Sequence, residues 1–229
     1  MKSARPQQIR ETGPAAIRCA GDRAFLVTPA DPGRVGQLVA ALSERTPAGV
    51  VDFLPAAETV LITLDSVGSA ARVRRGLEQI VADVSATERD VSRGTFTTTT
   101  EPLQIPVRYD GPDLECVADM LDMRPEQVIS AHTAAVWHCA FVGFAPGFGY
   151  LTAADWQSKV VRRSAARTRI PAGSVGLADS YTAVYPRETP GGWQLIGTTD
   201  LTMWDTGREP PALVRAGARV RFVDVDAAS

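Results

Sequence analysis

The first third of the chain alternates between the hydrophobic patterns of strands and helices. Short apolar runs predict four strands. They lie at residues 15–18, just before and up to Thr28, at residues 50–54 and at residues 59–64. After Asp31-Pro32-Gly33, an apolar helical stripe is formed by Val35, Leu38, Val39 and Leu42. A second stripe comprises Val67, Ala70, Leu77, Ile80 and Val81. This order predicts a small α+β domain at residues 15–86, with helices on one face of a mainly antiparallel sheet.

The next stretch has no pattern that supports a core. Residues 88–94 are charged and polar, and residues 97–100 are four threonines. A segment of this composition buries little apolar surface. We therefore expect a domain linker at residues 87–100.

Beyond residue 100 the pattern predicts one strand, two helices and then many short strands. The strand covers 103–109, one helix begins after Asp113, and another begins at Arg124-Pro125 and ends near His132. Later strand candidates cover 136–142, 174–177, 182–185, 193–197 and 219–225. Glycine and proline clusters separate them at short intervals. Residues 101–225 are therefore expected to form a β-barrel or sandwich with a helical insertion near its start.

Composition narrows the function classes. The 229 residues include 24 Lys+Arg against 26 Asp+Glu, a formal net charge of -2, so there is no basic excess for nucleic-acid binding. The chain has three widely spaced cysteines and two histidines, which argues against a disulfide framework or a zinc site. We find neither a signal peptide nor an apolar run of membrane-spanning length. We therefore expect a soluble, cytoplasmic protein with no metal, membrane or nucleic-acid partner.

Common enzyme motifs are missing from the sequence. There is no GxxxxGK[ST] phosphate loop, no GxGxxG, no GxSxG and no HExxH. The chain therefore offers no self-contained catalytic set.

Three segments rich in glycine and proline lie close together in the sequence. They are FVGFAPGFGYL at 141–151, RTRIPAGSV at 167–175, and Tyr185-Pro186 followed by TPGGW at 189–193. Glycine allows close approach of a ligand or chain, and interleaved aromatic rings supply flat contact area. The segments are either turns of a β-barrel or loops that carry a binding site.

In this order, the three segments resemble the allophanate hydrolase subunit 1 family. The same family is described as the B subunit of 5-oxoprolinase and as the carboxyltransferase C/D subdomain of urea carboxylases, and it includes an inhibitor of a sporulation histidine kinase. Residues 21–27 and 50–55 are similar too, so the resemblance covers roughly residues 17–224.

The resemblance implies a small α+β N-terminal domain followed by a cyclophilin-like β-barrel domain. It also implies a hydrolase that acts on carbon–nitrogen bonds only with a partner, subunit 2 (C), in a heterodimer or heterotetramer. Such complexes use ATP to cleave a small amide; 5-oxoproline, allophanate and other substrates stay open. No ATP site is evident on this chain.

His132 is the candidate catalytic residue, because the family has a histidine at this place and imidazole exchanges protons near neutral pH. The alternative is a histidine stabilised by the C-terminal end of a helix dipole. Phe148 and Tyr150 are expected to line a pocket or an interface. Gly191 and Gly192, in the third segment, are counted with the substrate-binding positions.

The remaining candidate site residues are two arginines, a serine and a tryptophan. Arg167 and Arg169 bind an anion or lie in solvent, Ser174 binds substrate or belongs to a turn, and Trp193 walls the site or fills the core. The family usually has an arginine where this chain has Thr198, and often a polar residue such as Gln where it has Tyr181. Both departures bear on substrate identity.

Two other functions stay open at this point. A regulatory protein that inhibits a sensor histidine kinase is the main alternative, motivated by the one regulatory relative and the aromatic loop. A peptidyl-prolyl isomerase is suggested only by analogy with the cyclophilin-like fold.

Overall fold

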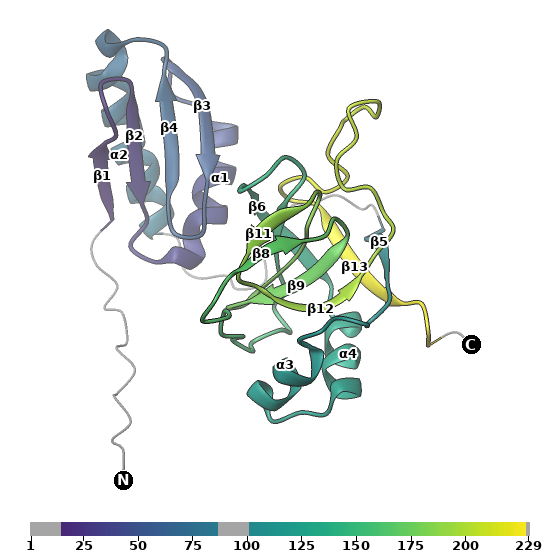
Figure 1. The fold of residues 1–229 in the computed structure, drawn as a ribbon. Helices are drawn as coiled ribbons and strands as arrows, with labels where there is room; N and C mark the ends of the chain where they lie inside the picture. The colour runs from purple at the N-terminus through teal and green to yellow at the C-terminus, as the bar shows by residue number, and fades with distance from the viewer. Residues whose placement is uncertain (1–14, 87–100, 228–229) are drawn as a thin grey trace. The chain divides into compact units, whose positions relative to one another are not determined.

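The computed structural model describes residues 15–86 and 101–227, which form two compact units (Figure 1). The predicted linker at 87–100 lies outside the described residues. Within the described residues, no helix is both long and apolar enough to cross a membrane.

The first unit is a four-stranded sheet with two helices on one face (Figure 1). Its antiparallel strands have the order β1 (Ala16–Cys19), β2 (Ala24–Thr28), β4 (Val60–Leu64) and β3 (Val50–Pro55). The helices are α1 (Val35–Glu44) and α2 (Ala70–Ala86), each preceded by a short 3-10 turn. Alternate residues of β2 and β4 join the two helical stripes in one core, as the periodicity predicts.

The second helical stripe is wrong at its start. Val67 lies in the 3-10 turn that precedes α2, and its side chain is 61% exposed. The buried face of α2 is instead formed by Val73, Leu77, Ile80 and Val84. The helix begins three residues after Val67, so this residue falls outside the helical stripe.

The second unit is built around a nearly closed barrel of mixed strand direction (Figure 1). Its seven strands follow the order β12 (Gln194–Thr198), β9 (Ser174–Ala178), β10 (Tyr181–Val184), β7 (Gly149–Thr152), β6 (Trp137–Val142), β13 (Arg219–Asp224) and β5 (Leu103–Val107). Only the β13–β5 pair of this sheet is parallel. Two backbone hydrogen bonds between Arg108 and Thr198, at 2.9 and 2.8 Å, join the edge strands.

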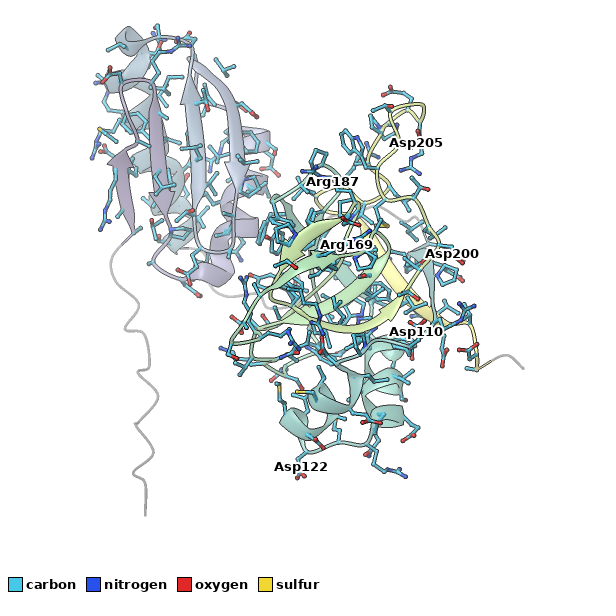
Figure 2. All side chains as sticks on the ribbon, in the orientation of Figure 1. Asp110, Asp122, Arg169, Arg187, Asp200 and Asp205 are labelled. Atoms are coloured by element: carbon cyan, nitrogen blue, oxygen red, sulfur yellow. The ribbon has the colours of Figure 1, made fainter. Side chains whose placement is uncertain are left out.

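Helices α3 (Leu114–Leu121) and α4 (Pro125–Ala134) contact β12 and β13 respectively. Pro125 is the first residue of α4, where its missing N–H costs nothing. Between the two helices Asp122 adopts a left-handed conformation, φ 54°, at the turn labelled in Figure 2. These elements agree with the predicted helical insertion.

A separate two-stranded ribbon consists of β8 (Arg167–Ile170) and β11 (Thr189–Gly191). Both strands lie in segments that the sequence marks mainly by glycine and proline. β7 likewise occupies the end of the first such segment. These short strands have too few residues to show a period of two.

Candidate functional site

Strands β7 and β10 separate two clusters of buried side chains. Leu151 and Val184 point into the barrel, whose interior is filled by apolar side chains. Their neighbours Tyr150 and Ala183 belong to a second cluster, because successive side chains of a strand point to opposite faces. The predicted site residues are therefore divided between the inside and the outside of the barrel sheet.

Six rings form what we call the outer aromatic cluster: Phe141, Phe148, Tyr150, Tyr181, Tyr185 and Trp193. Tyr150 is central, with ring centroids 4.3 Å from Phe141, 5.0 Å from Phe148 and 5.6 Å from Trp193. Most pairs meet edge to face, the geometry that the ring quadrupole favours. The structure thus brings together three predicted residues, Phe148, Tyr150 and Trp193.

A β-bulge places Phe141 in this cluster. Cys139 pairs with Leu151 and Phe141 with Tyr150, so Ala140 is the extra residue of β6. Cys139 belongs to the barrel interior, whereas the ring of Phe141 stacks on Tyr150 outside it. The extra residue re-aims the following side chain, as bulges do.

Gly191 lets the β8–β11 ribbon approach the rings. A Cβ atom at this position would lie 2.6 Å from the Tyr185 hydroxyl oxygen and 2.9 Å from Ile170 Cδ1. Gly192 has more room, with its nearest neighbour at 3.8 Å, and its carbonyl accepts a 2.9 Å hydrogen bond from the Arg163 N–H. Gly191 is required by close packing; a substrate contact for either glycine stays a prediction.

Arg162 is the charged group of the outer aromatic cluster, and sequence reasoning missed it. Its guanidinium carbon lies 5.9 Å from the Trp193 ring centroid. Burial raises the pKa of Tyr150, and that of Tyr185 to about 12, while the nearby Arg162 charge opposes both shifts. Both phenols are therefore neutral hydrogen-bond donors at pH 7. The available signal was the Arg162-Arg163 pair just before the second segment.

Arg167 is engaged by a buried carboxylate. Both of its terminal nitrogens donate 2.8 Å hydrogen bonds to Asp113, which also accepts from Arg163 Nη1 at 2.9 Å and from the Leu195 N–H at 2.7 Å. Asp113 is 3% exposed. Burial raises the pKa of its carboxyl, but the hydrogen bonds and the Arg167 charge outweigh burial and hold it below the usual range.

The other two polar candidates lie in different settings. Arg169, on strand β8 of the ribbon and labelled in Figure 2, pairs with Glu188 at 2.5 Å on an exposed part of the surface. Ser174 begins β9 and is buried, and its carbonyl accepts a 2.9 Å hydrogen bond from the Tyr185 N–H. Thr198, which stands where the family usually has arginine, donates a 2.9 Å hydrogen bond to Asp110.

His132 lies inside the barrel unit, with no exposed surface. Its Nδ1 is 2.7 Å from the Tyr109 hydroxyl, and its Nε2 is 3.0 Å from the Thr182 hydroxyl. Thr182 Oγ1 donates its proton to the Gly176 carbonyl at 3.2 Å, so it must accept from Nε2. The imidazole is therefore the Nε2–H tautomer, and Tyr109 donates to Nδ1.

Burial lowers the pKa of His132 to about 3. The ring stacks on Phe222 with centroids 4.4 Å apart and contacts Trp137. A neutral imidazole gains nothing from the helix dipole, so the dipole interpretation is not supported. Burial among these rings also favours a structural role for His132 in the core over a role as acid or base. The catalytic assignment of His132 therefore stays a prediction without geometric support.

No group of three or more His, Cys, Asp or Glu side chains that could hold a metal ion occurs in residues 15–86 and 101–227. Cys139 is buried, whereas Cys19 and Cys116 are exposed. None of the three cysteines takes part in a disulfide. The candidate site consists of the outer aromatic cluster and Arg162.

Known proteins resemble both the sequence and the fold. The B subunit of 5-oxoprolinase from Bacillus subtilis (strain 168) is 36% identical over 200 residues, which cover 84% of this chain and 83% of the relative. The crystal structure of TTHA0988 matches with 30% identity and a TM-score of 0.67, over 89% of this chain. This chain spans only 40% of the length of TTHA0988.

A more distant neighbour shows the fold alone. The Kluyveromyces lactis urea carboxylase has a TM-score of 0.70 with 20% identity, over 92% of this chain and 22% of that chain. The carboxyltransferase domain, subdomain C and D, matches residues 15–214. This match confirms the resemblance carried by the three segments. The chain is thus a member of the family of the carboxyltransferase domain, subdomains C and D.

Proposed function

We propose that this chain is the B-type subunit of a heteromeric, ATP-dependent hydrolase that cleaves the amide bond of 5-oxoproline or a similar small cyclic amide. The observation that carries the proposal is the 36% identity to the B subunit of Bacillus subtilis 5-oxoprolinase over most of both chains. We further propose that the barrel is cyclophilin-like and that the complex works in the cytoplasm.

The chemistry of the outer aromatic cluster supports a binding role. Its rings are flat and apolar, and Tyr150 and Tyr181 are the partly exposed ones. The hydroxyls of Tyr150 and Tyr185 are neutral donors at pH 7, because burial raises the pKa of both groups. Rings of this kind suit a small ring that carries polar groups at its edge. The two phenols are poor bases at this pH, so we assign the base for hydrolysis to a partner, subunit 2 (C), or to a further subunit.

The arginines named from the sequence do not fit a nucleotide. Arg167 is bound by Asp113 through two hydrogen bonds, and Arg169 is paired with Glu188. A triphosphate at these residues would have to displace both carboxylates. We therefore propose that the complex binds ATP away from this arginine pair, on a partner subunit.

The test is exchange of subunits in a working complex. The chain is purified together with its own partner subunits, and ATP-dependent release of glutamate from 5-oxoproline is measured. The same chain also replaces its counterpart in the Bacillus subtilis complex. We expect turnover that is lost when either this chain or ATP is omitted. An active Bacillus subtilis control beside no turnover in both mixtures would overturn the proposal.

A further inference from the structure

The backbone on both sides of Arg162 is held by hydrogen bonds with three residues of two other segments. Val160 exchanges two with Asp179, at 2.8 and 2.7 Å. The Val161 carbonyl accepts from Gln194 Nε2 at 2.9 Å, and the Arg163 N–H donates to the Gly192 carbonyl at 2.9 Å. This irregular segment is therefore fixed in place before any ligand arrives, which lowers the entropic cost of binding.

The neighbouring arginines already have carboxylate partners. Arg163 and Arg167 both bind Asp113, and Arg169 binds Glu188. Arg162 is exposed, and among the described residues it has no carboxylate partner. Its guanidinium instead faces the Trp193 ring. The Arg162 guanidinium is thus available to an anion beside the outer aromatic cluster.

The groups around this charge are those that recognise a carboxylate on a small ring. A guanidinium donates two parallel hydrogen bonds to a carboxylate, and stacking on an aromatic ring fixes its plane. The ring centroid of Tyr150 lies 5.6 Å from that of Trp193, and Phe148 contacts both. Phe148 and Trp193 are buried, whereas Tyr150 is partly exposed and interacts electrostatically with Arg162. A flat ring that contacts Tyr150 can therefore bring its carboxylate to Arg162.

We propose that Arg162 is the substrate-recognition residue of the outer aromatic cluster, and that it binds the carboxylate of a small carboxylated cyclic amide. This inference rests on the proposed function, because it assigns the substrate of that function to a site on this chain. A phosphate group carries the same kind of charge, so the experiment has to separate the two anions.

The experiment uses the assembled complex with wild-type chain, Arg162→Gln, Arg162→Lys and the control Arg221→Gln, which removes an equal charge from an exposed position on β13. Kinetics are measured with 5-oxoproline. We expect Arg162→Gln to raise KM by about tenfold or more, the loss typical of a charge-assisted hydrogen bond, with a smaller change in kcat. Arg162→Lys should be intermediate, and Arg221→Gln should match wild type.

Calorimetric titration of the same complexes provides a readout that needs no turnover. The probes are 5-oxoproline, 2-pyrrolidinone, which lacks the carboxylate, and inorganic phosphate. We expect Arg162→Gln to weaken the binding of 5-oxoproline and to leave the binding of 2-pyrrolidinone and of phosphate unchanged. An unchanged KM and affinity in Arg162→Gln overturns the inference and leaves the proposed function standing. Equal weakening of phosphate binding overturns the assignment to a carboxylate.

The two proposals fail in different ways. If the wild-type complex does not turn over 5-oxoproline, the proposed function fails. If the wild-type complex then still binds 5-oxoproline and the Arg162→Gln complex does not, the inference about the recognition site stands. Absence of such binding to the wild-type complex would overturn the site as well.

Discussion

Acid is expected to destabilise the barrel unit through His132. In the folded state burial holds the pKa of this imidazole at about 3, whereas the unfolded chain has a value near 6.5. Between these values the unfolded chain binds a proton that the folded chain does not. Stability is therefore full above about pH 6.5 and falls as the pH falls toward 3.

The size of the effect follows from the two pKa values. Within this window the free energy of unfolding falls by at most about 1.4 kcal/mol per pH unit. From pH 7 to pH 5 the expected loss is about 2 kcal/mol, because the unfolded histidine is only partly protonated at the upper end. Ordinary aspartates and glutamates titrate mainly below this range.

The assay is urea unfolding at pH 7, 6 and 5, followed by tryptophan fluorescence. All four tryptophans lie after residue 100, so the signal reports the barrel unit. His138→Gln serves as the background, because it removes the one other histidine. In the folded protein, NMR should show that His132 keeps its Nε2–H proton and does not titrate near pH 6.5.

Two results would refute this reasoning about His132. One is equal stability of the His138→Gln protein at pH 7 and pH 5. The other is an imidazole resonance of folded His132 that titrates near 6.5, which would require access to solvent. Either result would restore His132 as a candidate acid or base.

Three further predictions concern the packing of the barrel unit. Asp113→Asn should lower the free energy of unfolding by about 2–4 kcal/mol, because it leaves two partly buried arginines without their carboxylate; unchanged urea unfolding would contradict this. Gly191→Ala should cost about 1–3 kcal/mol through its clash with the Tyr185 hydroxyl, and Gly192→Ala, which has room for a methyl group, should cost less; equal losses would argue against the clash. Phe144 has φ 68°, and its ring contacts Phe148 and Tyr185, so Phe144→Gly and Phe144→Ala lose the same contacts. Because only glycine relieves the unfavourable φ, the Gly variant should be more stable than the Ala variant by about 1 kcal/mol; equal stability would contradict this.

Local patterns identified most of the elements. The stripe of Val35, Leu38 and Leu42 predicts α1, because the buried face of a helix repeats every three to four residues. Pro125 marks the start of α4 for an equally local reason, its fixed φ and missing N–H. Such signals need only a few neighbouring residues, so they can be read without the rest of the fold.

Long-range pairing was not available from the sequence. The parallel pairing of β13 with β5 joins strands more than one hundred residues apart. The bulge at Ala140, which moves Phe141 to the outer cluster, depends on the register between β6 and β7. No local pattern specifies a register of this kind.

The charged residues of the site show most clearly what the sequence could predict and what required the structure. The three segments alone pointed to Phe148, Tyr150 and Trp193, which the structure brings together. They also pointed to Arg167 and passed over Arg162, five residues earlier and chemically identical. Only the tertiary structure distinguishes the two, because the buried Asp113 binds Arg167, whereas Arg162 is exposed over Trp193. Residue types and their order thus determined the elements and the family, whereas burial and pairing determined which charge remains for a ligand.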